Sequence, residues 1–342
     1  MKYVITIPLV FDEKIRSFIS KGEFRDMNHF IMVALENQIN AEEGLAAWAI
    51  ESPGQIRRAP EEQLPHTDFG LSLTSKAYKT CPEPTMERLS DRLLWGQYYR
   101  FLPIKFSLRI LASLSTEKFP TLASFKDSAV TAAEAFGKQL KRRDRTLGNK
   151  SGEKISTSFP ETTEKSRTRF AEQYIGYVRS TDLKYSGMLL VLRFANVIPN
   201  NGIKEIGITP AGKEFCNLRN PVIDGQQGKE VFSHEEIDFL VHHISNKLPE
   251  EAQHMIKVLD LLHEGGKSRM DLNSALSLFY QQYQNPDSPW TEGVVNLMRA
   301  GVISRMFELG MINKKRNGLM VTYELTELGN KYRDLLSKIG GI

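Results

Sequence analysis

The 342-residue sequence predicts a mainly α-helical protein with small β elements. Two observations predict this class. A single alternating strand at residues 2–9 is followed directly by two short amphipathic helices. After about residue 100, a run of helices closed by a short β-hairpin occurs twice. No stretch of about eighteen apolar residues predicts a membrane span, and no signal-like segment opens the chain, so we expect a cytoplasmic protein.

The strand at residues 2–9 has one apolar face. Apolar side chains occupy the odd-numbered positions, whereas Lys2, Val4 and Thr6 lie on the other face. A lone strand cannot satisfy its backbone hydrogen bonds, and no second strand follows nearby. We therefore expect the same strand of a second copy to pair with it in a homodimer. The other interpretation is the first strand of an ordinary α/β sheet, although no glycine-rich loop follows it.

Two helices are expected after the strand, from Asp12 to Ser20 and from Asp26 to about Ala41, with Gly22 ending the first. Through this order and the segments YVITIPL and MNHFIMVALENQI, residues 1–44 resemble the ribbon-helix-helix repressors of the Arc, MetJ and CopG type. The resemblance implies a two-chain ribbon in the major groove of double-stranded DNA. The implied DNA contacts are Lys2, Val4 and Thr6 on the strand and Asn28 at the helix start.

Residues 45–99 are expected to connect this segment to the rest of the chain. Up to about residue 70 they are rich in Pro and Gly, which is typical of an ordered surface connection. Apolar side chains then recur at helical spacing and predict a helix docked on the next domain, through Leu89, Leu93, Leu94, Tyr98 and Phe101. Trp95, Tyr98 and Tyr99 could stack on bases, but aromatic residues at this spacing are more typical of a core.

Positive charge is concentrated in one segment. Residues 138–154 carry seven basic and two acidic side chains, a net charge of +5. Apolar residues are scarce onward to about residue 168, so we predict an exposed basic loop or helix end within 138–169. The candidate phosphate contacts are Lys141, Arg142, Arg143 and Arg145. A solvated charge run without a partner is the alternative.

The two copies of the repeat share their ending. Each has a hydrophobic corner, a polar turn containing glycine, a short strand and a new helix with the pattern T-x-x-G-x-x-aromatic. The pattern occurs at Thr209 to Phe215 and at Thr326 to Tyr332. The threonine at the helix start fits an N-cap. This repetition predicts two domains of one design.

A hairpin placed after three helices and before a fourth resembles the wing of a winged-helix domain, and two such domains are predicted, at residues 100–225 and 226–342. In the second, helices are expected at residues 250–263, 271–283 and 289–309, the wing at 311–325 and the fourth helix from Thr326. The resemblance implies a third helix in the major groove and a wing along the backbone. The implied contacts are Asn296, Arg299 and Arg305 on that helix, Lys314, Lys315 and Arg316 on its wing, and Arg179, Lys184 and Arg193 on the third helix of the first copy. Winged helices also serve as protein-protein modules.

No motif in the chain predicts catalysis. There is no phosphate-binding glycine loop, no nucleophile elbow and no paired metal-ligand spacing, so no enzyme, metal or cofactor is expected. Cys81 and Cys216 are expected to be free thiols. The sequence thus predicts a dimeric, sequence-specific double-stranded DNA-binding protein, either a transcriptional regulator or the recognition subunit of a defence, partition or replication assembly. The alternative is a structural adaptor whose winged helices bind proteins and whose N-terminus only dimerises.

Overall fold

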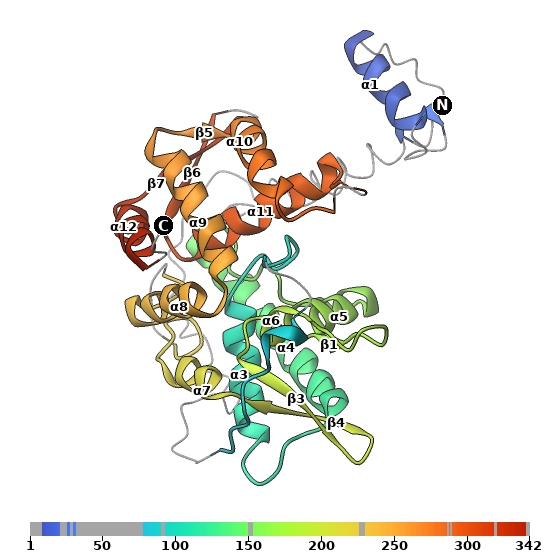
Figure 1. Cartoon of the computed structure of the whole chain (residues 1–342), viewed down its shortest axis with the longest axis vertical. Coiled ribbons are helices and arrows are strands. Elements are labelled where there is room, and N and C mark those ends of the chain that lie inside the picture. Colours follow the sequence, from blue (N-terminus) through green and yellow to red (C-terminus); the bar gives the residue numbers. More distant parts are fainter. Residues whose placement is uncertain are drawn as a thin grey trace, which may run out of the picture. The chain divides into compact units, whose positions relative to one another are not determined.

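The structure is a computed structural model of the chain (Figure 1). It describes residues 9–20, 26–27, 30–31, 78–89, 93–149, 153–225, 230–285, 287, 289–317 and 320–339. The chain divides into two compact units, unit 1 (residues 1–65) and unit 2 (residues 66–342), which are described separately. Helices predominate, and the sheets have two or three strands. The predicted class, mainly α with small β elements, is confirmed.

In unit 1, helix α1 spans Leu9–Ser20. The expected start at Asp12 was wrong, and Leu9 belongs to the helix rather than to the strand. Pro8 precedes the helix in the sequence, and a residue without an N–H is well tolerated where a helix begins. Arg16 and Asp12, one turn apart, form an exposed ion pair of 2.8 Å.

Little else of unit 1 is described. Residues 27, 30 and 31 are helical, and the Phe30 N–H donates to the Asp26 carbonyl at 3.1 Å, so the second helix begins where it was expected. The predicted strand with Lys2, Val4 and Thr6, and Asn28 beside the second helix, lie outside the described residues.

Unit 2 contains both copies of the repeat. Repeat 1 comprises α3 (Leu102–Leu114), α4 (Leu122–Leu147), α5 (Glu164–Phe170), the π-helix η2 (Ala171–Ile175), β1 (Tyr177–Val178), β2 (Tyr185–Ser186), α6 (Met188–Val191), β3 (Ala195–Asn200), β4 (Ile203–Ile208) and α7 (Pro210–Asn217). A connecting helix, α8 (His234–Lys247), follows. Repeat 2 comprises α9 (Pro249–His263), β5 (Lys267–Ser268), α10 (Arg269–Gln281), α11 (Glu292–Glu308), β6 (Ile312–Asn317), β7 (Met320–Leu325) and α12 (Glu327–Ile339). In Figure 1 the chain passes from repeat 1, coloured teal through green to yellow, to repeat 2, in orange and red.

The second repeat follows the predicted order closely. The β6–β7 hairpin is antiparallel, and β5 joins its β7 edge to give a three-stranded sheet in the order β5-β7-β6. Two helices differ from their expected bounds, because α10 spans Arg269–Gln281 rather than 271–283 and α11 starts at Glu292, not at residue 289. Thr291 caps this helix by accepting the Val294 N–H at 3.4 Å.

Both repeats close with the same corner, which confirms the internal repetition. Thr209 Oγ1 accepts the Gly212 N–H at 3.1 Å, and Thr326 Oγ1 accepts the Gly329 N–H at 3.0 Å. Each hydroxyl also donates to a carbonyl oxygen just before its hairpin, at 2.7 and 2.8 Å. A Cβ on either glycine would lie 2.0 or 2.1 Å from a carbonyl oxygen, so both positions require glycine.

The basic segment begins as the end of a helix, which is one of the two forms predicted for it. Helix α4 continues to Leu147 and ends at Gly148, whose φ of 66° is the left-handed C-cap conformation. The stretch beyond it is not free of core residues, since Ile155 and Phe159 are each only 7% exposed. The helix-end prediction is thus confirmed for residues 138–147, whereas the prediction that residues 138–169 are exposed was wrong at Ile155 and Phe159.

The expected third helix of repeat 1 is mostly absent. Arg179 and Lys184 lie in the turn between β1 and β2, where the Arg179 N–H donates to the Lys184 carbonyl at 2.8 Å. Only α6, four residues long, is helical in this region. Arg193 follows α6 and forms an ion pair of 3.0 Å with Glu83. Placing these basic residues on a helix was wrong.

Residues 93–101 form no helix in the structure, although one was predicted there. Leu94, Tyr98 and Phe101 are at most 3% exposed, so the prediction that the aromatic residues here belong to the core is confirmed for Tyr98, while Trp95 and Tyr99 are half-buried. Cys81 and Cys216 are free and buried, as expected. In the described ranges, no helix is both long and apolar enough to span a membrane.

Buried His243 on α8 predicts a dependence of stability on pH. Its ring, 7% exposed, donates from Nε2 to the Leu192 carbonyl at 2.7 Å, and burial lowers its pKa to about 4. The unfolded chain therefore binds this proton more readily, with a pKa of about 6.5. The stabilisation from neutral His243 is complete above about pH 6.5, and roughly 3 kcal/mol of it is lost as the pH falls to about 4.

We expect urea unfolding of His243→Gln to depend less on pH than the wild type between about pH 6.5 and pH 4. The matched control is His242→Gln, because His242 is the exposed neighbour on the same helix and keeps His243 in place. Equal pH dependence in the wild type and in His243→Gln would contradict the prediction.

Candidate nucleic-acid interface

The C-terminal part of α4 presents a row of exposed cations. Lys138 and Lys141 are exposed and paired, with Glu134 at 2.9 Å and Glu161 at 2.6 Å. Arg142 and Arg145 are exposed, lie further along the helix, and form no ion pair with any residue that the structure describes. Cations in the last turns of a helix oppose its dipole and stabilise it. The last turns of α4 thus support a positive face, here called the α4 end (residues 138–147).

A buried carboxylate anchors the segment that comes after the α4 end. Asp144, 2% exposed, accepts the N–H groups of Ile155 at 2.8 Å and Ser156 at 2.9 Å. These bonds hold residues 153–156 against the last turn of the helix. Arg143, the remaining basic candidate of this helix, is half-buried beside Asp144. Sequence reasoning missed the role of Asp144, because a single acid within a basic run gives no signal of burial.

The β6–β7 hairpin carries the second basic cluster. Lys314 is half-buried, with Nζ 4.0 Å from the centre of the Phe307 ring, and burial lowers its pKa to about 8. Lys315 is exposed and paired with Glu324 at 2.7 Å. Arg316 lies in β6 opposite Val321, and its side chain is outside the described part of the chain.

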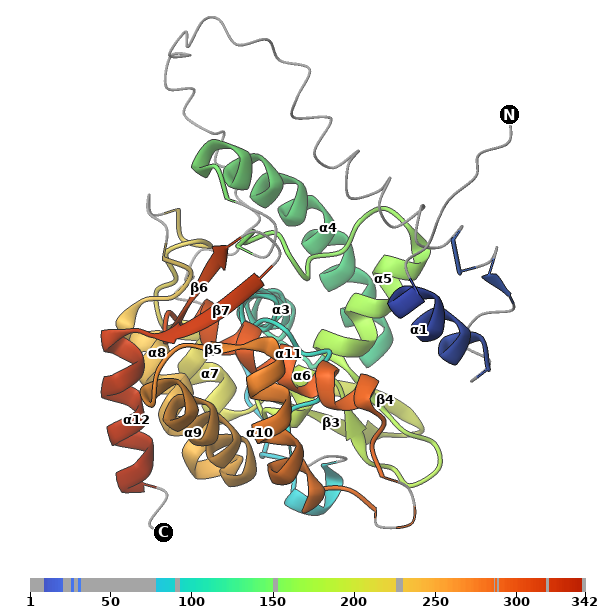
Figure 2. The same ribbon diagram turned by 90° about the horizontal axis from the view of Figure 1, so that it is seen from above.

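The two basic clusters belong to different repeats but lie on one side of unit 2. Figure 2 shows the α4 end on the same side as the β6–β7 hairpin. The carboxylate of Glu153, in the segment tied to Asp144, is near enough to Lys314 to raise its pKa, while Arg100 and Arg269 lower it. We therefore treat the α4 end and the hairpin together as one basic surface, defined by Lys138, Lys141, Arg142, Arg145, Lys314 and Lys315.

The third helix of repeat 2 does not join this surface. Arg305 is 1% exposed and donates to Glu251 at 2.6 Å and to the Tyr98 carbonyl at 2.7 Å. Arg299 is 7% exposed and donates to Asn273 at 2.6 Å. Their assignment as DNA contacts was wrong, because both guanidinium groups are enclosed in the protein.

The remaining candidates are half-buried, and the side chains of two of them are already bonded. Asn296 on α11 is half-buried and accepts a hydrogen bond from Asn273 at 2.5 Å. Arg179 forms an ion pair of 2.5 Å with Asp182 in the β1–β2 turn. Lys184 is half-buried in the same turn. None of these three lies in either basic cluster.

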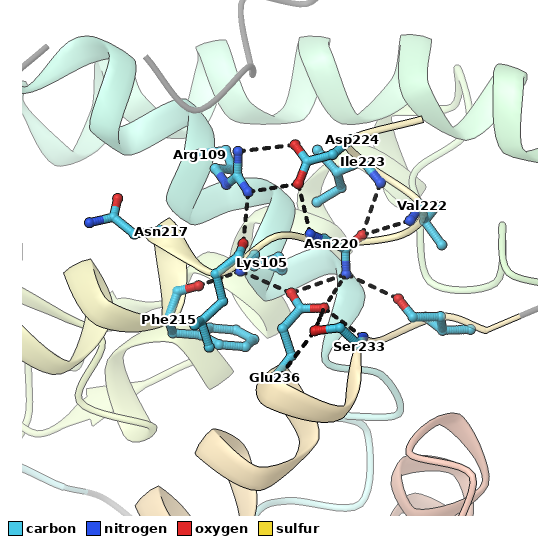
Figure 3. Close-up of polar contacts among 12 residues, drawn as sticks. Lys105, Arg109, Phe215, Asn217, Asn220, Val222, Ile223, Asp224, Ser233 and Glu236 are labelled. Carbon is cyan, nitrogen blue, oxygen red and sulfur yellow. Dashed lines mark hydrogen bonds and ion pairs between the residues drawn. The ribbon is translucent and has the colours of Figure 1, made fainter. Parts of the chain in front are cut away.

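A separate polar cluster holds the connection between the repeats and was not predicted (Figure 3). Lys105 of α3 and Glu236 of α8 are fully buried and form an ion pair of 2.9 Å. Lys105 also donates to the carbonyls of Phe215 and Leu218. Burial lowers the pKa of Lys105 and raises that of Glu236, and the ion pair opposes both shifts. With all three ammonium protons bonded, this cluster is structural.

The rest of the cluster fixes the chain between α7 and α8. Asn220 donates to Glu236 and accepts the N–H groups of Val222 and Ile223. Arg109 pairs with Asp224 at 3.1 Å. One part of the cluster had a sequence signal, because Ser233 and Glu236 have the spacing of a capping box and form one.

Comparison with known proteins finds no matching family model, no matching curated protein and no matching solved structure.

Proposed function

We propose that the chain is a homodimeric, sequence-specific double-stranded DNA-binding protein, acting as a transcriptional regulator or as the recognition subunit of a larger assembly. The observation that supports this most is the basic surface, on which cations from both repeats lie on one side of unit 2. Arg142 and Arg145 supply exposed charge there without a carboxylate partner among the described residues. DNA phosphates are the polyanion that such a surface fits.

Two further observations support the domains that this function requires. The order α9, β5, α10, α11, β6, β7, with a sheet ordered β5-β7-β6, is the order of a winged-helix domain, and repeat 1 ends in the same corner. We assign winged-helix domains to both repeats on this ground. In unit 1, α1 and the helical residues after Asp26 fit the two helices of a ribbon-helix-helix segment, whose strand would pair with that of a second copy.

The test is the salt dependence of binding to a random-sequence duplex of about 30 bp. The logarithm of affinity should fall linearly with the logarithm of salt concentration, with a slope of about −0.9 for each phosphate contact. We expect the full-chain variant Arg142→Glu with Arg145→Glu to bind at least roughly tenfold more weakly and to have a slope less steep by about two.

The control variant also replaces two cations by glutamate, but near the N-terminal end of α4. Lys79 and Lys118 are exposed, and Lys79 is hydrogen-bonded through its backbone to Ser115, before α4 begins. From there to Arg142 the helix extends about 30 Å. Lys79→Glu with Lys118→Glu should keep wild-type affinity and slope. If the wild type binds no duplex at low salt, the DNA-binding proposal is wrong.

One observation favours the adaptor function as a second candidate. Met270 and Leu278 on α10 are 79% and 70% exposed. Eight residues apart, they lie on one side of the helix, and exposed apolar side chains of this size are typical of protein contacts. Wild-type protein that fails to bind DNA but associates with a protein partner through α10, and loses that partner on Met270→Ser with Leu278→Ser, would establish this function instead.

A further inference from the structure

In each repeat, the helix that directly precedes the closing hairpin is largely enclosed in unit 2: α6 in repeat 1 and α11 in repeat 2. In repeat 1, all four residues of α6 are 0% exposed. In repeat 2, Glu292 and Gly293 at the start of α11 are exposed, and every residue from Val294 to Glu308 is buried or half-buried. A helix that reads bases in the major groove must present three or four side chains along one open face. Apart from Glu292 and Gly293, neither α6 nor α11 has an exposed residue, so neither presents such a face.

The segment 93–101 encloses them. A Cβ on Gly301 of α11 would lie 2.5 Å from the Gly96 carbonyl oxygen, so backbone packs on backbone there. The Gly96 N–H meets the Met298 sulfur at 3.1 Å. Exposing α11 to DNA would therefore require removing residues 93–101 from the core.

Tyr98 ties this segment to both repeats at once. Its carbonyl accepts from Arg305 of α11 at 2.7 Å, and its hydroxyl accepts the N–H of Gly187, directly before α6, at 2.9 Å. At the end of α11, the Glu308 carboxylate accepts the Phe101 N–H at 2.5 Å, where α3 begins. Residues 93–101 thus bury α6 and α11 where the two repeats pack against each other.

We propose that unit 2 holds duplex DNA through its phosphates alone, on a composite surface made by the α4 end of repeat 1 and the β6–β7 hairpin of repeat 2. This inference rests on the proposed function and specifies how unit 2 takes part in it. It departs from the mode in which a winged helix inserts its third helix into the major groove. Any discrimination between DNA sequences then comes from another part of the chain.

The charges on the surface suit exchangeable phosphate contacts. Lys141 and Lys315 are paired with Glu161 and Glu324, and all four side chains are at least 38% exposed. Exposed pairs of this kind contribute little stability, so a phosphate can replace the carboxylate at little cost. Arg142 and Arg145 need no such exchange, because no described carboxylate holds them.

Replacing arginine by lysine separates phosphate contact from base reading. Lysine keeps the charge that a phosphate needs, but it lacks the planar fork with which arginine contacts O6 and N7 of guanine. The experiment selects sequences from a random duplex library of about 40 bp with the full chain, as wild type, as Arg142→Lys with Arg145→Lys, and as Arg142→Glu with Arg145→Glu. Affinity is then measured for the enriched sequence and for the unselected library.

We expect the lysine variant to enrich the same sequence as the wild type and to keep its affinity within about threefold. The glutamate variant, and separately Lys315→Glu, should lower affinity for the enriched and the unselected duplexes by the same factor. A lysine variant that enriches a different sequence, or loses roughly tenfold or more of the preference for the enriched one, shows that α4 reads bases and overturns the inference.

The remaining outcomes separate this inference from the proposed function. If the wild type retains no duplex at all, both are wrong. If it retains duplex but enriches no sequence, phosphate-only binding by unit 2 is supported, while sequence specificity in the proposed function is wrong. The variant Lys79→Glu with Lys118→Glu again controls for net charge.

Discussion

Replacing Lys105 by alanine is expected to lower the free energy of unfolding by about 3–5 kcal/mol. The substitution leaves the fully buried Glu236 carboxylate without its cation, which lies 2.9 Å away in the wild type. It also removes one hydrogen bond from each of the Phe215 and Leu218 carbonyls, which keep only the Leu218 N–H at 3.3 Å and Arg109 Nη2 at 3.0 Å as donors. Urea unfolding followed by circular dichroism measures the effect.

A double variant shows whether the loss comes from the uncompensated charge. Lys105→Met with Glu236→Gln removes both charges, keeps the volume of each side chain and leaves an amide oxygen to cap α8. It should recover most of the stability, because replacing a buried ion pair by neutral groups of similar size is often close to neutral. A loss below about 1 kcal/mol in Lys105→Ala would show that the cluster contributes little.

Arg305→Ala is expected to lower the free energy of unfolding by about 3–5 kcal/mol as well, for the same physical reason. Glu251, 0% exposed, keeps only the hydrogen bond from the Leu94 N–H and its contact with His254, and the Tyr98 carbonyl loses its donor. If Arg305 is structural, the folded variant keeps the wild-type slope of the logarithm of DNA affinity against the logarithm of salt concentration. A slope less steep by about one, with stability unchanged, would instead make Arg305 a phosphate contact.

Local capping made the ends of the repeats predictable. The side chains of Thr209 and Thr326 bond the N–H groups three residues ahead, so their patterns can be seen within a short stretch of sequence. Helices α9 and α10 and the β6–β7 hairpin were predicted for the same reason, because each shows its own period and its own turn residues. The basic segment of α4 also had a local signal that favoured the helix end over the loop, since KQLKRRDRTL consists largely of good helix formers and is followed by Gly148.

The surface of unit 2 could not be predicted in this way. Arg299 and Arg305 look solvent-facing in a helix sequence, but Arg305 meets Tyr98, which lies 207 residues earlier in the chain. Its burial depends on which segment covers α11, and a residue's own type and spacing do not contain that information. The basic surface shared by the α4 end and the β6–β7 hairpin joins two repeats and has no local signal for the same reason.

The backbone contact between Gly96 and Gly301 bears on the spacing between the DNA contacts of unit 2. Tandem domains on a flexible linker sample many separations, so the distance between their DNA contacts varies from one complex to another. In unit 2 the repeats share one hydrophobic core, so the separation between the α4 end and the hairpin is set by packing. If the proposed function holds, the phosphates that unit 2 contacts are separated by the same distance in every complex with DNA.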